Sequence, residues 1–178
     1  MSIYKEQKTS KPKIETVIDD YICEEEQKDL RHFLDFLSAN KLTPAWASGN
    51  SWAVKYKSKT VCYIKFIQEV PNSDTPWHWY IYHSNFTREK WFVDYDSYIV
   101  DRGVKDFVLN NIVPPACPNS KCAGWQNLTI LGKTFPAVCG CWPIRLRAPS
   151  GEDLESSKKL VEAIKAFIGD RIPAGKKK

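Results

Sequence analysis

Three runs of alternating residues between positions 52 and 83 constrain the fold most strongly. They cover 52–57, 60–66 and 77–83, and turn-forming residues separate them at Ser58-Lys59 and in the proline-bounded loop 71–76. Parallel neighbouring strands need crossover connections of about a dozen or more residues, whereas antiparallel strands can be joined by short turns. These runs therefore predict an antiparallel β-meander.

Apolar residues at helical spacing predict helices around this sheet. The segment 24–40 places Leu30, Phe33, Leu34 and Leu37 on one face, and 150–169 carries a similar stripe from Leu154 to Ile168. Two weaker helical patterns follow: one begins at Thr87, and the other covers 104–112. We therefore expect one α+β domain over residues 14–172, an antiparallel β-meander flanked by helices with a small zinc-ribbon-like insert.

The charge of the chain is concentrated at its ends. The formal net charge is +5, but 14–169 contains 18 basic and 19 acidic residues. We expect the lysine-rich segments 1–13 and 173–178 to be disordered tails, because neither has apolar periodicity. The near-neutral body argues against a nucleic-acid partner. Since no apolar run follows Met1 or reaches membrane-spanning length, we expect a cytoplasmic protein without a membrane partner.

Four of the six cysteines lie in two close pairs within 117–141: Cys117, Cys122, Cys139 and Cys141. Between the pairs, 128–135 reads as a short hairpin with Gly132-Lys133 at its turn. Two pairs of thiols bridged by a hairpin are typical of a ribbon-type zinc site. We therefore predict that these four cysteines bind one zinc ion within an insert at about 115–143. A closed four-cysteine shell indicates a structural metal.

The spacing within each cysteine pair leaves alternatives open. Four residues separate Cys117 from Cys122, and one separates Cys139 from Cys141, whereas a standard zinc knuckle has two. The four thiols could instead be reduced, or the first pair could form a disulfide. An iron–sulfur cluster fits the spacing less well than zinc. A three-cysteine site completed by His78 or His83 is a further alternative that the spacing does not favour.

The run 77–83 carries large rings on both of its faces. A sheet with one face in water normally alternates apolar and polar residues, so either helices cover both faces or one face lines a cleft. Aromatic side chains with polar tips suit a small, flat or anionic ligand. The alternative is a ring-rich core with tyrosine hydroxyls at its edge. The candidate ligand-binding residues are Trp77, His78, Trp79, Tyr80, Tyr82 and Arg88.

Sequence motifs give little support for catalysis. The chain has no G-x-S-x-G, H-E-x-x-H or phosphate-binding glycine-rich motif, and its three histidines offer few general bases. We lean against an enzyme and expect a cytosolic binding or adaptor domain with a structural zinc ion. The alternative is a metal-handling protein of iron- or zinc-chaperone type, or an enzyme that uses the aromatic and histidine cleft.

The order of the predicted elements resembles a known family. An N-terminal helix precedes a tryptophan-led, lysine-bearing hairpin at 52–66, and a late strand at 142–147 leads into a Leu-Glu-x-x-Lys-Lys-Leu-Val helix. This order is similar to that of the uncharacterised bacterial YdhG-like domains. The resemblance implies a small cytosolic α+β protein, and some of these domains are described as iron chaperones. The four-cysteine segment is not part of their pattern, and no functional residue carries over.

Overall fold

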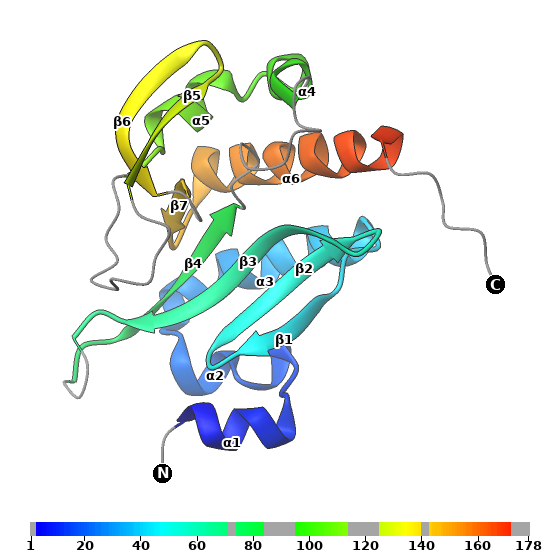
Figure 1. The fold of residues 1–178 in the computed structure, drawn as a ribbon. Coiled ribbons are helices and arrows are strands. Elements are labelled where there is room, and N and C mark those ends of the chain that lie inside the picture. Colours follow the sequence, from blue (N-terminus) through cyan, green and yellow to red (C-terminus); the bar gives the residue numbers. More distant parts are fainter. Residues whose placement is uncertain (1–2, 71–73, 84–94, 114–124, 140–142, 172–178) are drawn as a thin grey trace.

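The computed structural model describes residues 3–70, 74–83, 95–113, 125–139 and 143–171, with the backbone alone at 3–5, 125–126 and 139. The described chain is α+β, with a five-stranded antiparallel sheet, a separate two-stranded hairpin and six α-helices (Figure 1). In spatial order the sheet contains β1 (Pro44–Ser48), β2 (Ser51–Tyr56), β3 (Lys59–Gln68), β4 (Trp77–His83) and β7 (Ile144–Arg147). The hairpin pairs β5 (Trp125–Ile130) with β6 (Lys133–Cys139). The helices are α1 (Ile3–Ser10), α2 (Ile18–Tyr21), α3 (Glu24–Ala39), α4 (Tyr95–Asp101), α5 (Lys105–Asn110) and α6 (Gly151–Arg171), with a 3-10 turn at Ile14–Thr16.

The predicted antiparallel meander is confirmed in β2, β3 and β4. Strands β2 and β3 are joined by a two-residue turn, Lys57-Ser58, at which both residues have positive φ, 46° and 66°. Two-residue turns of this kind follow the right-handed twist of the flanking strands. The short connection therefore fixes both the direction and the register of the hairpin.

One face of the sheet and two long helices form the core. In Figure 1, α3 lies behind β2 and β3, and the other face of the sheet is turned to the viewer. Trp52, Phe66 and Trp79 are fully or almost fully buried on the helical side of the sheet, where α3 and α6 contribute apolar side chains. The apolar stripes of both helices were predicted from sequence, and Leu30, Phe33 and Leu37 of α3 are 0% exposed.

The segment 1–13 differs from its predicted disorder, because residues 3–10 form α1. Gln7 in this helix is 5% exposed. Its side-chain amide donates to Oδ1 of Asn50 at 2.5 Å, and its oxygen accepts from the Asn50 backbone N–H at 2.7 Å. Trp52 Nε1 also donates to the Pro12 carbonyl at 2.8 Å. Polar contacts attach this segment to the sheet, so apolar periodicity could not reveal it.

The predicted cysteine-flanked hairpin is present as β5 and β6, although its turn begins one residue earlier than expected. Leu131 and Gly132 have positive φ of 52° and 79°, the conformation that a two-residue hairpin requires at both positions. Helix α6 also extends to Arg171, beyond its predicted end at Gly169. Of the predicted zinc-ribbon insert at 115–143, only 125–139 and Pro143 lie within the described residues.

Candidate functional site

The face of the sheet opposite α3 and α6 carries aromatic and basic residues in cross-strand rows. In one row Tyr63 of β3 lies opposite Tyr82 of β4, which lies opposite Arg145 of β7. The next row runs from Lys65 through Tyr80 to Arg147. Strand residues two positions apart share a face, so the rows are neighbours. We call this surface the open face, defined by Tyr63, Lys65, His78, Tyr80, Tyr82, Arg145 and Arg147.

The tyrosine rings of the open face are half-buried and lie close together. The ring centroids of Tyr80 and Tyr82 are 6.0 Å apart, with the planes tilted by 36°. The Arg145 guanidinium lies 5.6 Å from the centre of the Tyr82 ring, within the range of a cation–π contact. Half-buried aromatic rings of this kind can pack against a flat ligand.

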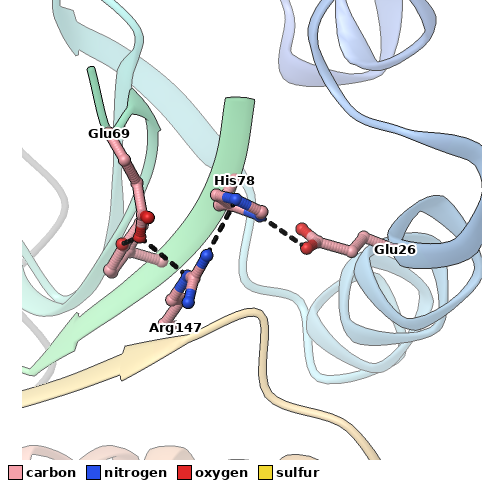
Figure 2. A network of polar contacts seen from close by, with 5 residues as sticks. Glu26, Glu69, His78 and Arg147 are labelled. Carbon is pink, nitrogen blue, oxygen red and sulfur yellow. Dashed lines mark hydrogen bonds and ion pairs between the residues drawn. The ribbon is translucent and has the colours of Figure 1, made fainter. Parts of the chain in front are cut away.

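A network of polar contacts fixes the second row (Figure 2). Arg147 Nε lies 2.9 Å from Oε1 of Glu69, just beyond the end of β3. The Tyr80 hydroxyl donates to the same Glu69 oxygen at 2.9 Å. The Arg147 side chain is 51% exposed and that of Glu69 is 37% exposed. One carboxylate oxygen thus lies where a tyrosine hydroxyl and a guanidinium meet, and we call this point the carboxylate position.

His78 extends the network to the edge of the sheet. Arg147 Nη2 lies 2.9 Å from His78 Nε2, and His78 Nδ1 lies 2.6 Å from Oε1 of Glu26 in α3. A guanidinium can only donate hydrogen bonds, so Nε2 accepts and the proton of a neutral imidazole is on Nδ1, from which it is donated to Glu26. Glu26 therefore sets the tautomer of His78, and His78 orients Arg147.

The surroundings of Tyr80 keep its hydroxyl protonated. Burial raises the pKa of Tyr80 to about 12, with further contributions from the hydrogen bond to Glu69 and from the charge of Glu69. The nearby Arg147 acts in the opposite direction, but its effect is smaller. At neutral pH, Tyr80 is therefore a hydrogen-bond donor to the carboxylate position.

The structure separates the candidate residues of the 77–83 strand. His78, Tyr80 and Tyr82 lie on the open face. Trp79 is 0% exposed and packs against Phe33 in the core, with ring centroids 6.1 Å apart. Trp77 faces the same side as Trp79 and makes an edge contact with Tyr21. Both tryptophans therefore support the strand from behind the open face, and Arg88 lies outside the described residues.

Sequence reasoning missed four residues of the network and its surroundings. Arg145 and Arg147 belong to a run that alternates apolar and basic residues, and this alternation could have placed both on one face. Glu69 follows β3, and Glu26 lies in the first turn of α3, where it also suits the helix dipole. Neither glutamate has a sequence signal that points to β4.

The strand β4 ends at a buried histidine that faces the core. His83 lies opposite Cys62 of β3, and both are 0% exposed. Neither ring nitrogen of His83 has a hydrogen-bond partner within the described part of the chain. Burial lowers the pKa of His83 to about 3 and raises the pKa of the Cys62 thiol. Both groups are uncharged at neutral pH, so they do not form an activated nucleophile.

The predicted zinc ligands lie largely beyond the described residues. Cys117, Cys122 and Cys141 are outside them, and Cys139 is described only as the backbone end of β6, opposite Trp125. Over 3–70, 74–83, 95–113, 125–139 and 143–171, no group of three or more potential metal ligands occurs. The zinc site stays a prediction from sequence.

Grooves on the helical side do not involve the open face. One of about 780 Å³ lies between α3 and α6 and is lined by Lys28, His32 and Glu155 among others. An adjacent groove of about 540 Å³ shares His32 and Glu155 and includes Lys158. Lys158 Nζ is 2.6 Å from Glu155 Oε1 and 3.1 Å from His32 Nε2. This lysine is therefore engaged by neighbouring side chains.

Comparisons with known proteins leave the chain without an assigned relative. No protein-family model, curated protein or solved structure matches it. No helix within the described residues is long and apolar enough to cross a membrane.

Proposed function

We propose that the protein is a non-enzymatic binding domain that holds a small, flat molecule on its open face. The observation that supports this most directly is the pair of Tyr–Arg rows on β4 and β7, on the side of the sheet away from α3 and α6. The packing of the sheet does not by itself require half-exposed aromatic rings beside cations at this position. Aromatic rings supply stacking area and the cations supply specificity, a combination common in ligand sites.

The proposal is tested by a screen of planar aromatic fragments against Tyr82 variants. Tyr82→Thr removes the ring but keeps a strand-forming residue, so fragment binding measured by NMR should be lost. Tyr82→Phe keeps the ring and should retain binding. Tyr56→Thr is the matched control, because Tyr56 is also a half-buried strand tyrosine but lies beside Lys165 and Gly169 of α6.

Two results of this screen would contradict the proposal. One is that no planar fragment binds the folded wild-type protein. The other is that the fragments bind equally well to wild-type and Tyr82→Thr protein while Tyr56→Thr weakens them, which would place binding on the helical side.

An acid–base enzyme using His78 is a second candidate, favoured by the 2.6 Å contact that lets Glu26 orient the imidazole. A general base needs a free nitrogen lone pair within reach of a substrate proton. Arg147 donates to that lone pair at 2.9 Å. The network as it stands therefore supports binding better than proton transfer.

Single-stranded nucleic acid is a possible alternative occupant of a face with tyrosines and arginines. Such binding relies on a groove with positive charge along the path of the backbone. Residues 14–169 contain 18 basic and 19 acidic residues, and Glu69 interrupts the basic character of the face itself. These charges favour a small ligand.

The four-cysteine zinc site belongs to the same proposal as a structural element. Its support is the pairing of Cys117 and Cys122 before the β5–β6 hairpin and of Cys139 and Cys141 at and after its end. Free thiolates bind zinc only where they are not oxidised, so this proposal presupposes a reducing compartment such as the predicted cytoplasm. Metal handling remains the alternative if the ion is labile.

A further inference from the structure

We infer that the ligand of the open face carries a carboxylate, which replaces Glu69 at the carboxylate position. This inference rests on the proposed function and specifies the chemistry of the ligand. It starts from the convergence of the Tyr80 hydroxyl and Arg147 Nε, each 2.9 Å from Glu69 Oε1. The protein's own side chain thus marks a point at which a carboxylate oxygen is bound by two donors.

The contact between Glu69 and Arg147 is easily exchanged. Their side chains are 37% and 51% exposed, and ion pairs this exposed contribute little to stability because water screens them. Glu69 lies after the last residue of β3 and is not part of a strand. A ligand carboxylate can therefore take its place without breaking the sheet.

The donors remain in place when Glu69 leaves. Arg147 is held from the other side by His78, and His78 is held by Glu26 at 2.6 Å. Tyr80 belongs to the central part of β4, between β3 and β7. A preorganised pair of donors loses little conformational freedom on binding. The entropic cost of binding a ligand carboxylate at this position is therefore small.

The charge of the surroundings favours an anion. Lys65, Arg145 and Arg147 lie on the open face, and among the described residues the carboxylates in contact with Arg147, Tyr80 or His78 are Glu69 and, at the edge, Glu26. A ligand that displaces Glu69 brings its own carboxylate, so the negative charge beside Arg147 is retained. The ring of the ligand can then lie against Tyr80 and Tyr82, whose ring centroids are 6.0 Å apart. An aromatic carboxylate can therefore contact both the tyrosine rings and the two donors at the carboxylate position.

The test compares 2-naphthoate with the uncharged 2-naphthamide, which has the same ring system, by calorimetric titration and NMR. Wild-type protein should bind the carboxylate more tightly by about tenfold, the difference that one charge-assisted hydrogen bond makes. Arg147→Gln should reduce binding of 2-naphthoate to the level of the amide and leave the amide unchanged. Glu69→Gln should bind 2-naphthoate severalfold more tightly, because it removes the competing charge.

The pair formed by Arg102 and Glu162 provides the matched control. It is a surface Arg–Glu contact of 2.8 Å with side chains 41% and 37% exposed, and it lies away from the open face. Arg102→Gln and Glu162→Gln should leave both affinities unchanged. Circular dichroism of each variant confirms that it is folded.

Three outcomes would overturn the inference, and they separate it from the proposed function. In the first, 2-naphthoate and 2-naphthamide bind equally well, and binding is unaffected by Arg147→Gln but lost in Tyr82→Thr. This result would support a site for flat ligands on the open face and contradict the inference that the ligand carries a carboxylate. Tighter binding of 2-naphthyl phosphate than of 2-naphthoate would reassign the ligand to the phosphate monoesters. Binding of none of these probes, together with a negative fragment screen, would remove both proposals.

Discussion

His83 makes the stability of the fold depend on pH. Its pKa is lowered from 6.5 to about 3 because the ring is buried. Between these values the unfolded chain binds a proton that the folded chain does not. The free energy of unfolding therefore falls as the pH falls through this range, with a slope of up to about 1.4 kcal/mol per pH unit from this group.

Urea denaturation at several pH values from 7 to 4 measures this effect against His83→Leu, which has no proton to bind. The carboxylates titrate in both proteins and largely cancel in the difference. We expect the wild type to lose stability relative to the variant as the pH falls below 6.5. Curves that stay parallel over the whole range would show that His83 is not buried in its neutral form.

Residue-level reasoning could predict which face of β4 and of β7 each side chain lies on, but it could not predict the two glutamates that complete the network. Period-two alternation places His78, Tyr80 and Tyr82 on one face of a strand, and the same alternation places Arg145 and Arg147 on one face of another. Glu26 and Glu69 meet this face only because α3 and the end of β3 bring them there. No pattern in the sequence around either glutamate predicts its contact with this face.

At the level of elements, α1 shows that a polar contact can position a helix that lacks an apolar stripe. Gln7→Ala should lower the free energy of unfolding by about 1–3 kcal/mol, because it leaves the buried Asn50 N–H without its acceptor. The measurement is urea denaturation, with hydrogen exchange at Asn50 as a local probe. Lys8→Ala, an exposed position on the same helix, is the control. An equally small effect of both changes would mean that the contacts of Gln7 with Asn50 do not stabilise the fold.

The β5–β6 hairpin is the element to which the zinc prediction belongs. If Cys117, Cys122, Cys139 and Cys141 bind one zinc ion, the purified protein should contain one equivalent by elemental analysis. Chelation should then abolish hydrogen-exchange protection in 115–143 first, because the hairpin contributes only Leu128, Ile130 and Val138 to the buried core, whereas the sheet and the helices supply most of it. Four freely reactive thiols in protein without metal, or uniform loss of protection over the chain, would contradict this.

On the scale of the whole molecule, local connections could be predicted and distant ones could not. The β2–β3–β4 meander follows from short turns. The placement of β7 beside β4 joins strands that are 60 residues apart in the chain, and no periodicity encodes such a pairing. This one pairing brings Arg145 and Arg147 beside Tyr82 and Tyr80, so the open face emerges only in the assembled fold.

The most direct test of the account is an NMR map of the full-length protein during titration with 2-naphthoate. We predict that the largest chemical-shift changes fall on Tyr63, Tyr80, Tyr82 and Arg147, in β3, β4 and β7, and on Glu69 just beyond β3. Residues that line the groove between α3 and α6, such as His32 and Glu155, should change little. Changes concentrated in that groove, or an absence of saturable changes on the open face, would contradict the claim that this face of the sheet is the binding site.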